Sequence, residues 1–306
     1  MRATAPGGAP AALRSDLPRD GESPERAAAR LAARRGALIA LPPIATMTLL
    51  FVIPLAIVAV YSFATRGRTG RTVLGDWNIA AYARLGEPLV LEVVGRSLGY
   101  AVLTTAICLV IGYPFAYWLT TRPMRVRAVM IVLVMLPFWS NLLVRTYAWR
   151  VLLASDGPIP AAFAALGLGE LRLLFTPFAV VLGLVYGYLP FMVLPLYAAL
   201  ERLDLRLVEA ARDLGASGWE AFRHVTWPLS RPGVVAGSVL VMVPTFGAYV
   251  TPELLGGSRT TLVGSFVVRQ FLSARDWPFG SALSMAILLL MLVATVVYFR
   301  LQEGRA

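Results

Sequence analysis

The chain has 306 residues, of which 58% are hydrophobic and 15% are charged, and its mean hydropathy is +0.70. Soluble domains carry about 25% charged residues, so this composition argues against a large soluble helical protein and favours a polytopic membrane protein. The net charge is +11, and all 28 cationic side chains are arginines. They stand at the ends of apolar segments and in the N-terminal tail, which disfavours a nucleic-acid-binding function.

The chain holds one cysteine, Cys108, and one histidine, His224. A single cysteine excludes an intramolecular disulfide and a multi-cysteine metal site, and one histidine cannot complete a zinc cluster. The sequence also lacks a G-x-S-x-G elbow and paired carboxylates within its apolar segments, which disfavours an intramembrane enzyme. We therefore expect no catalytic residue, no metal site and no cofactor bound by this chain.

Six long apolar segments predict an all-α polytopic membrane protein with six transmembrane helices, because about 20 apolar residues cross about 30 Å of hydrocarbon. Residues 1–36, rich in Ala, Arg, Gly and Pro, are expected to form a disordered cytoplasmic tail, and residues 37–301 the transmembrane domain. A signal peptide is disfavoured because its apolar core would be only about 7–15 residues long. The expected spans are residues 37–64, 98–119, 128–153, 173–200, 233–252 and 281–298.

The orientation of these spans follows from the turn after the second one. This short turn carries Arg122, Arg125 and Arg127, and the positive-inside rule places such turns in the cytoplasm. With six spans, both termini and the segment 203–228 are then cytoplasmic.

The third span is expected to continue past Arg145. At about 1.5 Å per residue, Arg145 would lie roughly 27 Å beyond the arginine turn, near the outer interface, where arginine side chains reach towards water. An arginine within the membrane is the alternative, and such charges are usually functional. Prolines inside or near the spans favour bent helices over a straight bundle. They are Pro54, Pro114, Pro137, Pro190, Pro195 and Pro244.

The segment 203–228 is the longest polar stretch between apolar runs, and its residues predict two short helices. Asp204 can cap the first helix, LRLVEAARDL, and Gly215 stands where a left-handed residue ends a helix. Ser217 and Glu220 have the spacing of a capping box that starts a second helix, which the proline closing the segment would end. Such a knob at a membrane surface favours docking to a partner over catalysis.

The residues of this knob resemble a known motif. Glu209-Ala210-Ala211, followed by Gly215, Val225 and Pro228, match the E-A-A-x-x-x-G coupling motif with its later I-x-L-P. That motif is typical of permease subunits of bacterial ATP-binding-cassette (ABC) importers. Trp227, where the motif has Leu, is the larger departure. The segments PFWSNLLVRTYAW (137–149), ELLGG (253–257) and RDWPFG (275–280) resemble the spermidine/putrescine permease branch.

This resemblance implies a type I importer permease fold in a bacterial inner membrane. It also implies three partners: a cytoplasmic ATP-binding subunit dimer, a second six-span permease and an extracytoplasmic solute-binding protein. ATP would be used by the partner, because this chain has no lysine and so no Walker A motif. The expected coupling residues are Glu209, Ala210, Ala211, Asp213 and Gly215. Glu209 and Asp213 are four residues apart, so they share a helix face that could meet basic groups of the ATPase.

A polyamine is the solute that the resemblance favours, and aromatic faces attract its ammonium groups. Candidate pathway residues are Trp139, Tyr147, Tyr186, Tyr188, Phe246, Tyr249 and Glu253. The competing interpretation is that aromatic residues near span ends anchor the helices at the interface. The expected spans hold no carboxylate, so polyamine recognition would rest mostly on the partners. The alternative function is a stand-alone secondary transporter or channel, which would not need the E-A-A knob.

Overall fold

The structure is a computed structural model, and it describes residues 24–67, 72–167, 169, 172–257 and 260–303. The chain forms two compact units, Met1–Val60 and Tyr61–Ala306. The part of the chain described contains five helices that are long and apolar enough to cross a membrane. A sharply bent helix pair makes a sixth span when it is counted as one.

The first unit is dominated by helix α2, which runs from Pro24 to Ser62. Its apolar part, Ala40–Ser62, has the length of a membrane span. The expected disordered tail is therefore wrong for residues 24–36, which are helical. These residues are rich in alanine and arginine, both good helix formers, so they extend the apolar helix instead of ending it. The rest of the expected tail, residues 1–23, lies outside the described residues.

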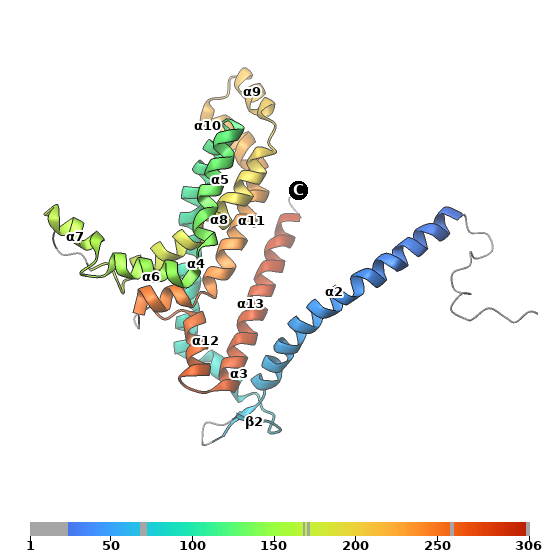
Figure 1. Ribbon diagram of the computed structural model, residues 1–306, viewed down its shortest axis with the longest axis vertical. Coiled ribbons are helices and arrows are strands. Elements are labelled where there is room, and N and C mark those ends of the chain that lie inside the picture. Colours follow the sequence, from blue (N-terminus) through green and yellow to red (C-terminus); the bar gives the residue numbers. More distant parts are fainter. Residues whose placement is uncertain (1–23, 68–71, 168, 170–171, 258–259, 304–306) are drawn as a thin grey trace, which may run out of the picture. The chain divides into compact units, whose positions relative to one another are not determined.

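The core of the second unit consists of three helices that pack side by side (Figure 1): α4 (Pro88–Thr120), α8 (Pro177–Glu201) and α11 (Trp227–Phe246). Cys108 and Ala116 of α4 are fully buried there against Met192 and Leu196 of α8. All three helices begin at residues other than those expected, and α11 begins six residues before residue 233. Helix α4 begins ten residues before residue 98, with a proline in its first turn, where the missing N–H costs nothing.

Helix α8 begins at Pro177, four residues after the expected start. The hydroxyl of Thr176 accepts a hydrogen bond from Ala179 N at 3.3 Å, so it caps the helix. Phe175, just before it, has a left-handed φ of +59°, which the regular helix does not allow. The apolar residues before the cap therefore belong to a loop.

Small residues bring α8 and α11 together. Gly233 and Gly237 of α11 are four apart and face α8. A Cβ atom at Gly233 would lie 2.5 Å from Ala199 Cβ and 2.8 Å from the Pro195 carbonyl oxygen. This is the small-xxx-small arrangement that allows membrane helices to approach closely.

The expected third span is not one helix. It is broken into α5 (Met124–Trp139) and α6 (Leu142–Leu153). The run Leu142–Ala165, which α6 begins, is bent by 90° from α5. Asn141 ends the apolar run, because its side chain accepts a hydrogen bond from Leu143 N at 2.8 Å and so starts a new helix. Ser140 is extended at the junction, with ψ of 148°. The distance expected between the arginine turn and Arg145 along a straight helix is therefore wrong.

The fifth span also differs from the expectation. Residues Gly218–Phe246 are continuously helical, passing through a π-helical turn, η2 (Phe222–Thr226). The proline closing the knob, Pro228, lies in the first turn of α11 and does not end a helix. Proline has no backbone N–H to donate to the preceding turn of a helix. The wider π turn directly before Pro228 accommodates this loss, so the helix continues. The helix ends at Phe246, six residues before the expected boundary, and residues 247–249 form a turn before the chain becomes helical again.

Among the remaining elements, the hairpin, α3 (Ala80–Ala83) and α12 (Val263–Leu272) lie at the end of the bundle opposite to the knob (Figure 1). A short antiparallel hairpin pairs β1 (Thr65–Arg66) with β2 (Thr72–Val73), with Arg66 opposite Thr72. Helix α13 (Trp277–Glu303) contains the sixth expected span and starts four residues earlier. The other elements are η1 (Arg84–Gly86), α7 (Pro158–Ala165) and η3 (Pro252–Gly256).

Candidate functional site

The polar segment between α8 and α11 folds into two short helices, α9 (Leu205–Asp213) and α10 (Gly218–Ala221), at one end of the bundle (Figure 1). The Asp204 carboxylate accepts a hydrogen bond from Arg206 N at 3.0 Å and caps α9. Ser217 and Glu220 form the complete capping box, since each side chain accepts a hydrogen bond from the other residue's backbone N–H. Both caps were predicted from the sequence, and both are confirmed.

Gly215 makes the reversal between the two helices. Its φ is +90°, and its N–H donates to Arg212 O at 2.9 Å while Ala216 N donates to Ala211 O at 3.0 Å. These two bonds are the Schellman pattern, which requires a left-handed residue at this position and strongly favours glycine. The knob is therefore closed by its own backbone.

The knob presents most of the expected coupling residues to solvent. Glu209, Ala210, Asp213 and Gly215 are exposed, and Ala211 is half-buried. Sequence reasoning missed two large apolar side chains beside them: Leu214 is 90% exposed and Trp219 is 68% exposed. A surface hollow of about 420 Å³ separates the two helices, and Ala211, Leu214, Gly215, Ala216, Glu220 and His224 line it. Exposed apolar groups around a hollow are typical of a docking surface.

The second half of the knob is fastened to the bundle by aromatic side chains. Trp227 lies 5.5 Å from the Tyr113 ring of α4, and Phe222 lies 5.7 Å from the same ring in an edge-on arrangement. The Tyr113 hydroxyl forms a 2.7 Å hydrogen bond with Ser230. Trp227, the departure from the family motif, thus has a structural role, because it fills the contact between the knob and α4.

A second hollow, of about 450 Å³, lies where the α5–α6 break meets α8 and the end of α11. Arg145 of α6 reaches into it. The Arg145 guanidinium donates a hydrogen bond to Pro137 O across the break at 2.8 Å and lies 5.7 Å from the ring centre of Tyr186. The opposite wall holds Tyr188, whose hydroxyl donates to Pro244 O at 3.4 Å, and Tyr249.

The structure brings only some of the expected pathway residues together. Tyr188 and Tyr249 line this hollow, and Tyr186 lines an adjoining one of about 260 Å³ with Arg145. Phe246 is 1% exposed within the core, so it lines neither hollow. Trp139 is 80% exposed at the end of α5, Tyr147 is 50% exposed on α6, and Glu253 is paired with Arg269 at 3.1 Å.

Arg145 is a lining residue that the sequence analysis did not include among the pathway candidates. Asn141 is the residue from which the break before Arg145 could have been predicted, because a capping residue inside an apolar run marks the start of a new helix. Among the described residues that line the larger hollow, Arg145 is the only one with an ionisable guanidinium, ammonium or carboxylate group, and none is acidic.

Comparison with protein families matches residues 36–304 to the family described as "Binding-protein-dependent transport system inner membrane component". The chain is 44% identical over 221 residues to the spermidine/putrescine transport system permease protein PotB of Escherichia coli (strain K12), covering 72% of this chain and 80% of that protein. It is 42% identical over 250 residues to PotB of Haemophilus influenzae, covering 81% and 87%.

A solved structure has the same fold. A chain of the bacterial alginate ABC transporter, in complex with an alginate pentasaccharide-bound periplasmic protein, superposes with a TM-score of 0.70 at 16% identity. The match covers 88% of this chain and 94% of that one. The family match and the PotB identities together give the assignment: the chain belongs to the inner-membrane permease subunits of binding-protein-dependent ABC importers, which transport solutes with a separate ATPase subunit.

Proposed function

We propose that this permease imports a polyamine such as spermidine or putrescine, and that the knob formed by α9 and α10 transmits the movement of the ATPase to the bundle. The single observation that carries the coupling role is the closed knob itself. It presents Glu209, Asp213 and Leu214 outwards, while Phe222 and Trp227 fasten it to α4. A rigid knob fixed to a core helix passes on a push at its surface, whereas a mobile loop would absorb it.

The partners are those the family implies. The knob docks into a cytoplasmic ATP-binding subunit dimer, and its exposed carboxylates meet basic groups there through charge-assisted hydrogen bonds. A second six-span permease completes the transmembrane passage, and an extracytoplasmic binding protein delivers the solute. The arginine-rich turn between α4 and α5 supports cytoplasmic N- and C-termini.

The passage through this subunit runs along the hollow at the α5–α6 break. Tyr188 and Tyr249 offer ring faces and hydroxyls to a cation, which rings attract. Arg145 opposes a cation, and no acidic group among the described lining residues compensates for it. We therefore assign polyamine recognition to the binding protein and the second permease, and to this wall a weakly binding, passing contact.

Replacing Arg145 with methionine is expected to slow import about tenfold. The change removes a hydrogen bond from a charged donor, which contributes about 1.5–3 kcal/mol, and loosens the break between α5 and α6. A loss of about 1.4 kcal/mol in the active arrangement corresponds to a tenfold change in rate. Initial uptake rates measure this. Arg150→Met, on the same helix but beside the Phe175 ring, is the control; equal effects of the two changes would contradict the role of the break.

Reconstitution in proteoliposomes tests the function. We expect spermidine uptake only when the ATPase subunits, the second permease, the binding protein and ATP are all present. Uptake without the ATPase would favour the stand-alone transporter instead. Titrating the purified binding protein with spermidine and putrescine tests the substrate separately, since a bound ligand raises its melting temperature. If neither raises it, the polyamine assignment is wrong, whatever the result for ATP dependence.

A further inference from the structure

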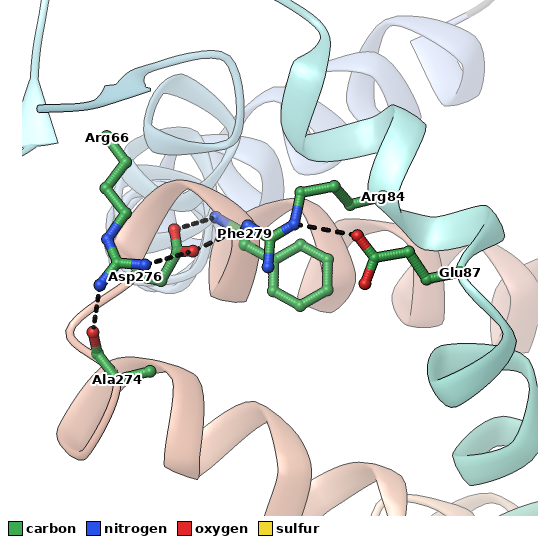
Figure 2. Close-up of polar contacts among 6 residues, drawn as sticks. All are labelled: Arg66, Arg84, Glu87, Ala274, Asp276 and Phe279. Carbon is green, nitrogen blue, oxygen red and sulfur yellow. Dashed lines mark hydrogen bonds and ion pairs between the residues drawn. The ribbon is translucent and has the colours of Figure 1, made fainter. Parts of the chain in front are cut away.

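One carboxylate is buried at the end of the bundle opposite to the knob. Asp276 lies directly before α13 and is 1% exposed. Its Oδ2 accepts hydrogen bonds from Arg84 at 2.8 Å and from Arg66 at 3.3 Å, and its Oδ1 accepts one from Phe279 N at 3.3 Å (Figure 2). Both oxygens are used, so the side chain is held in one orientation.

The two arginines come from segments far away in the sequence. Arg66 of β1 is 210 positions from Asp276 and also donates to Ala274 O at 2.9 Å. Arg84 of η1 is 192 positions away, lies 4.0 Å over the Phe279 ring and pairs with Glu87 at 3.3 Å (Figure 2). Asp276 thus connects the hairpin, the segment leading into α4 and the first turn of α13.

The opposite charges in this cluster stabilise one another's ionised forms. Partial burial alone would lower the pKa of the Arg84 guanidinium, but the hydrogen bond and negative charge of Asp276, followed by Glu87, outweigh it and raise that pKa. Taking a charged group out of water is favourable only when partners compensate. The cluster is therefore a matched set, in which the buried carboxylate depends on both arginines.

Helix α13 is held mainly at the end next to this cluster. Phe279, Ala282 and Leu283, in its first two turns, are 2%, 0% and 1% exposed. Further along, Leu289 and Val293 are 53% and 57% exposed. The second half of α13 is therefore more exposed within this chain than its first two turns, and Asp276 joins those two turns to the start of α4.

We propose that Asp276 is a positioning residue for import: it fixes the first turn of α13 to the segment that leads into α4. This inference rests on the import function. The movement that the knob delivers to α4 then carries the fixed end of α13 with it, and the rest of the helix turns about that end. Without the carboxylate, α4 moves and α13 lags, so that ATP is hydrolysed with little solute transported.

Asp276→Asn tests this directly, since asparagine keeps the shape and an acceptor for Phe279 N but loses the charge. In the complete complex in proteoliposomes, we expect the solute imported per ATP hydrolysed to fall by about fivefold or more, the lower range of coupling effects. ATP hydrolysis itself should continue. Glu87→Gln is the matched control, because it removes an exposed partner of the same arginine and should leave the ratio unchanged.

A conservative variant and a double-mutant cycle distinguish a positioning role of Asp276 from a general loss of structure. Asp276→Glu keeps the charge and should recover a part of the ratio. Arg84→Gln should lower the ratio alone but add little to Asp276→Asn, as expected for residues that act through one contact. If Asp276→Asn does not assemble, Arg84→Gln and Arg66→Gln carry the test.

Two results would overturn the proposal. The first is an unchanged ratio in Asp276→Asn, whether import and hydrolysis both stay at the wild-type level or fall in proportion. The second, if that variant does not assemble, is an unchanged ratio in both arginine variants. The wild-type complex is measured in parallel. If it does not import in an ATP-dependent way, the import function fails, whereas normal wild-type import with an unaffected variant ratio removes only the role of Asp276.

Discussion

Gly215→Pro is expected to abolish ATP-driven import while the membrane helices still insert. Gly215 has a φ of +90°, and proline is restricted to a φ of about −65°. Proline also lacks the N–H that donates to Arg212 O at 2.9 Å. Both changes open the Schellman turn, so α9 and α10 lose their fixed angle and the knob no longer matches the ATPase surface. Import by this variant in the presence of ATP should fall to the background level that is measured in the absence of ATP.

Two glycine variants separate the turn from the loss of a glycine in itself. A Cβ atom at Gly215 meets nothing within 4 Å, so Gly215→Ala suffers only from the left-handed backbone, about 1–2 kcal/mol, and should retain partial import. Gly218, at the start of α10, also has open space and no left-handed φ, so Gly218→Ala should import normally. Co-purification of the ATPase subunit, with uptake rates, measures the series. Wild-type import by Gly215→Pro would remove the knob from the mechanism.

The knob could be predicted in detail because its structure is local. The cap at Asp204, the turn at Gly215 and the box between Ser217 and Glu220 each join atoms at most five residues apart. Such contacts depend on residue type and spacing, which the sequence displays directly. The fastening of the knob is different, since Trp227 meets Tyr113 of α4, more than a hundred residues away.

The spans were predicted in number but not in shape. An apolar run shows that a segment can cross a membrane, and it does not show whether the segment is straight. Ser140 and Asn141 are uncharged, so they leave the third run apolar while dividing it into α5 and α6. For the same reason, a distance measured along a straight helix did not show that Arg145 lies near Tyr186 and lines one hollow with Tyr188.

The candidate pathway residues show that the sequence does not reveal which side chains face the hollow. Phe246 and Tyr249 are three positions apart near the end of α11, and both were expected to face the solute. Helix α11 ends at Phe246, which is buried, and the turn after it places Tyr249 in the hollow. Asp276 was part of a recognised motif, but its burial by two distant arginines depends on tertiary packing that a single sequence does not reveal.

The other large effect is expected at the contact of α8 with α11. Gly233→Val should destabilise the permease by about 3 kcal/mol or more, the upper range for overpacking. Its new side chain would start 2.8 Å from the Pro195 carbonyl oxygen and 2.5 Å from Ala199 Cβ, and a backbone atom cannot move aside without shifting the helix. Gly237→Ala should cost less, because the nearest atom to its Cβ is the flexible Met192 sulfur at 2.7 Å.

Thermal unfolding of the purified permease in detergent measures this order. Gly99→Ala is the matched control, since Gly99 lies within α4 and a Cβ there meets nothing within 4 Å. Alanine is the better helix former by about 1 kcal/mol, so this variant should be at least as stable as the wild type. If the Gly233→Val and Gly99→Ala proteins had the same melting temperature, α8 and α11 could separate at no cost in stability. The knob, which joins these two helices, would then have no rigid bundle to move.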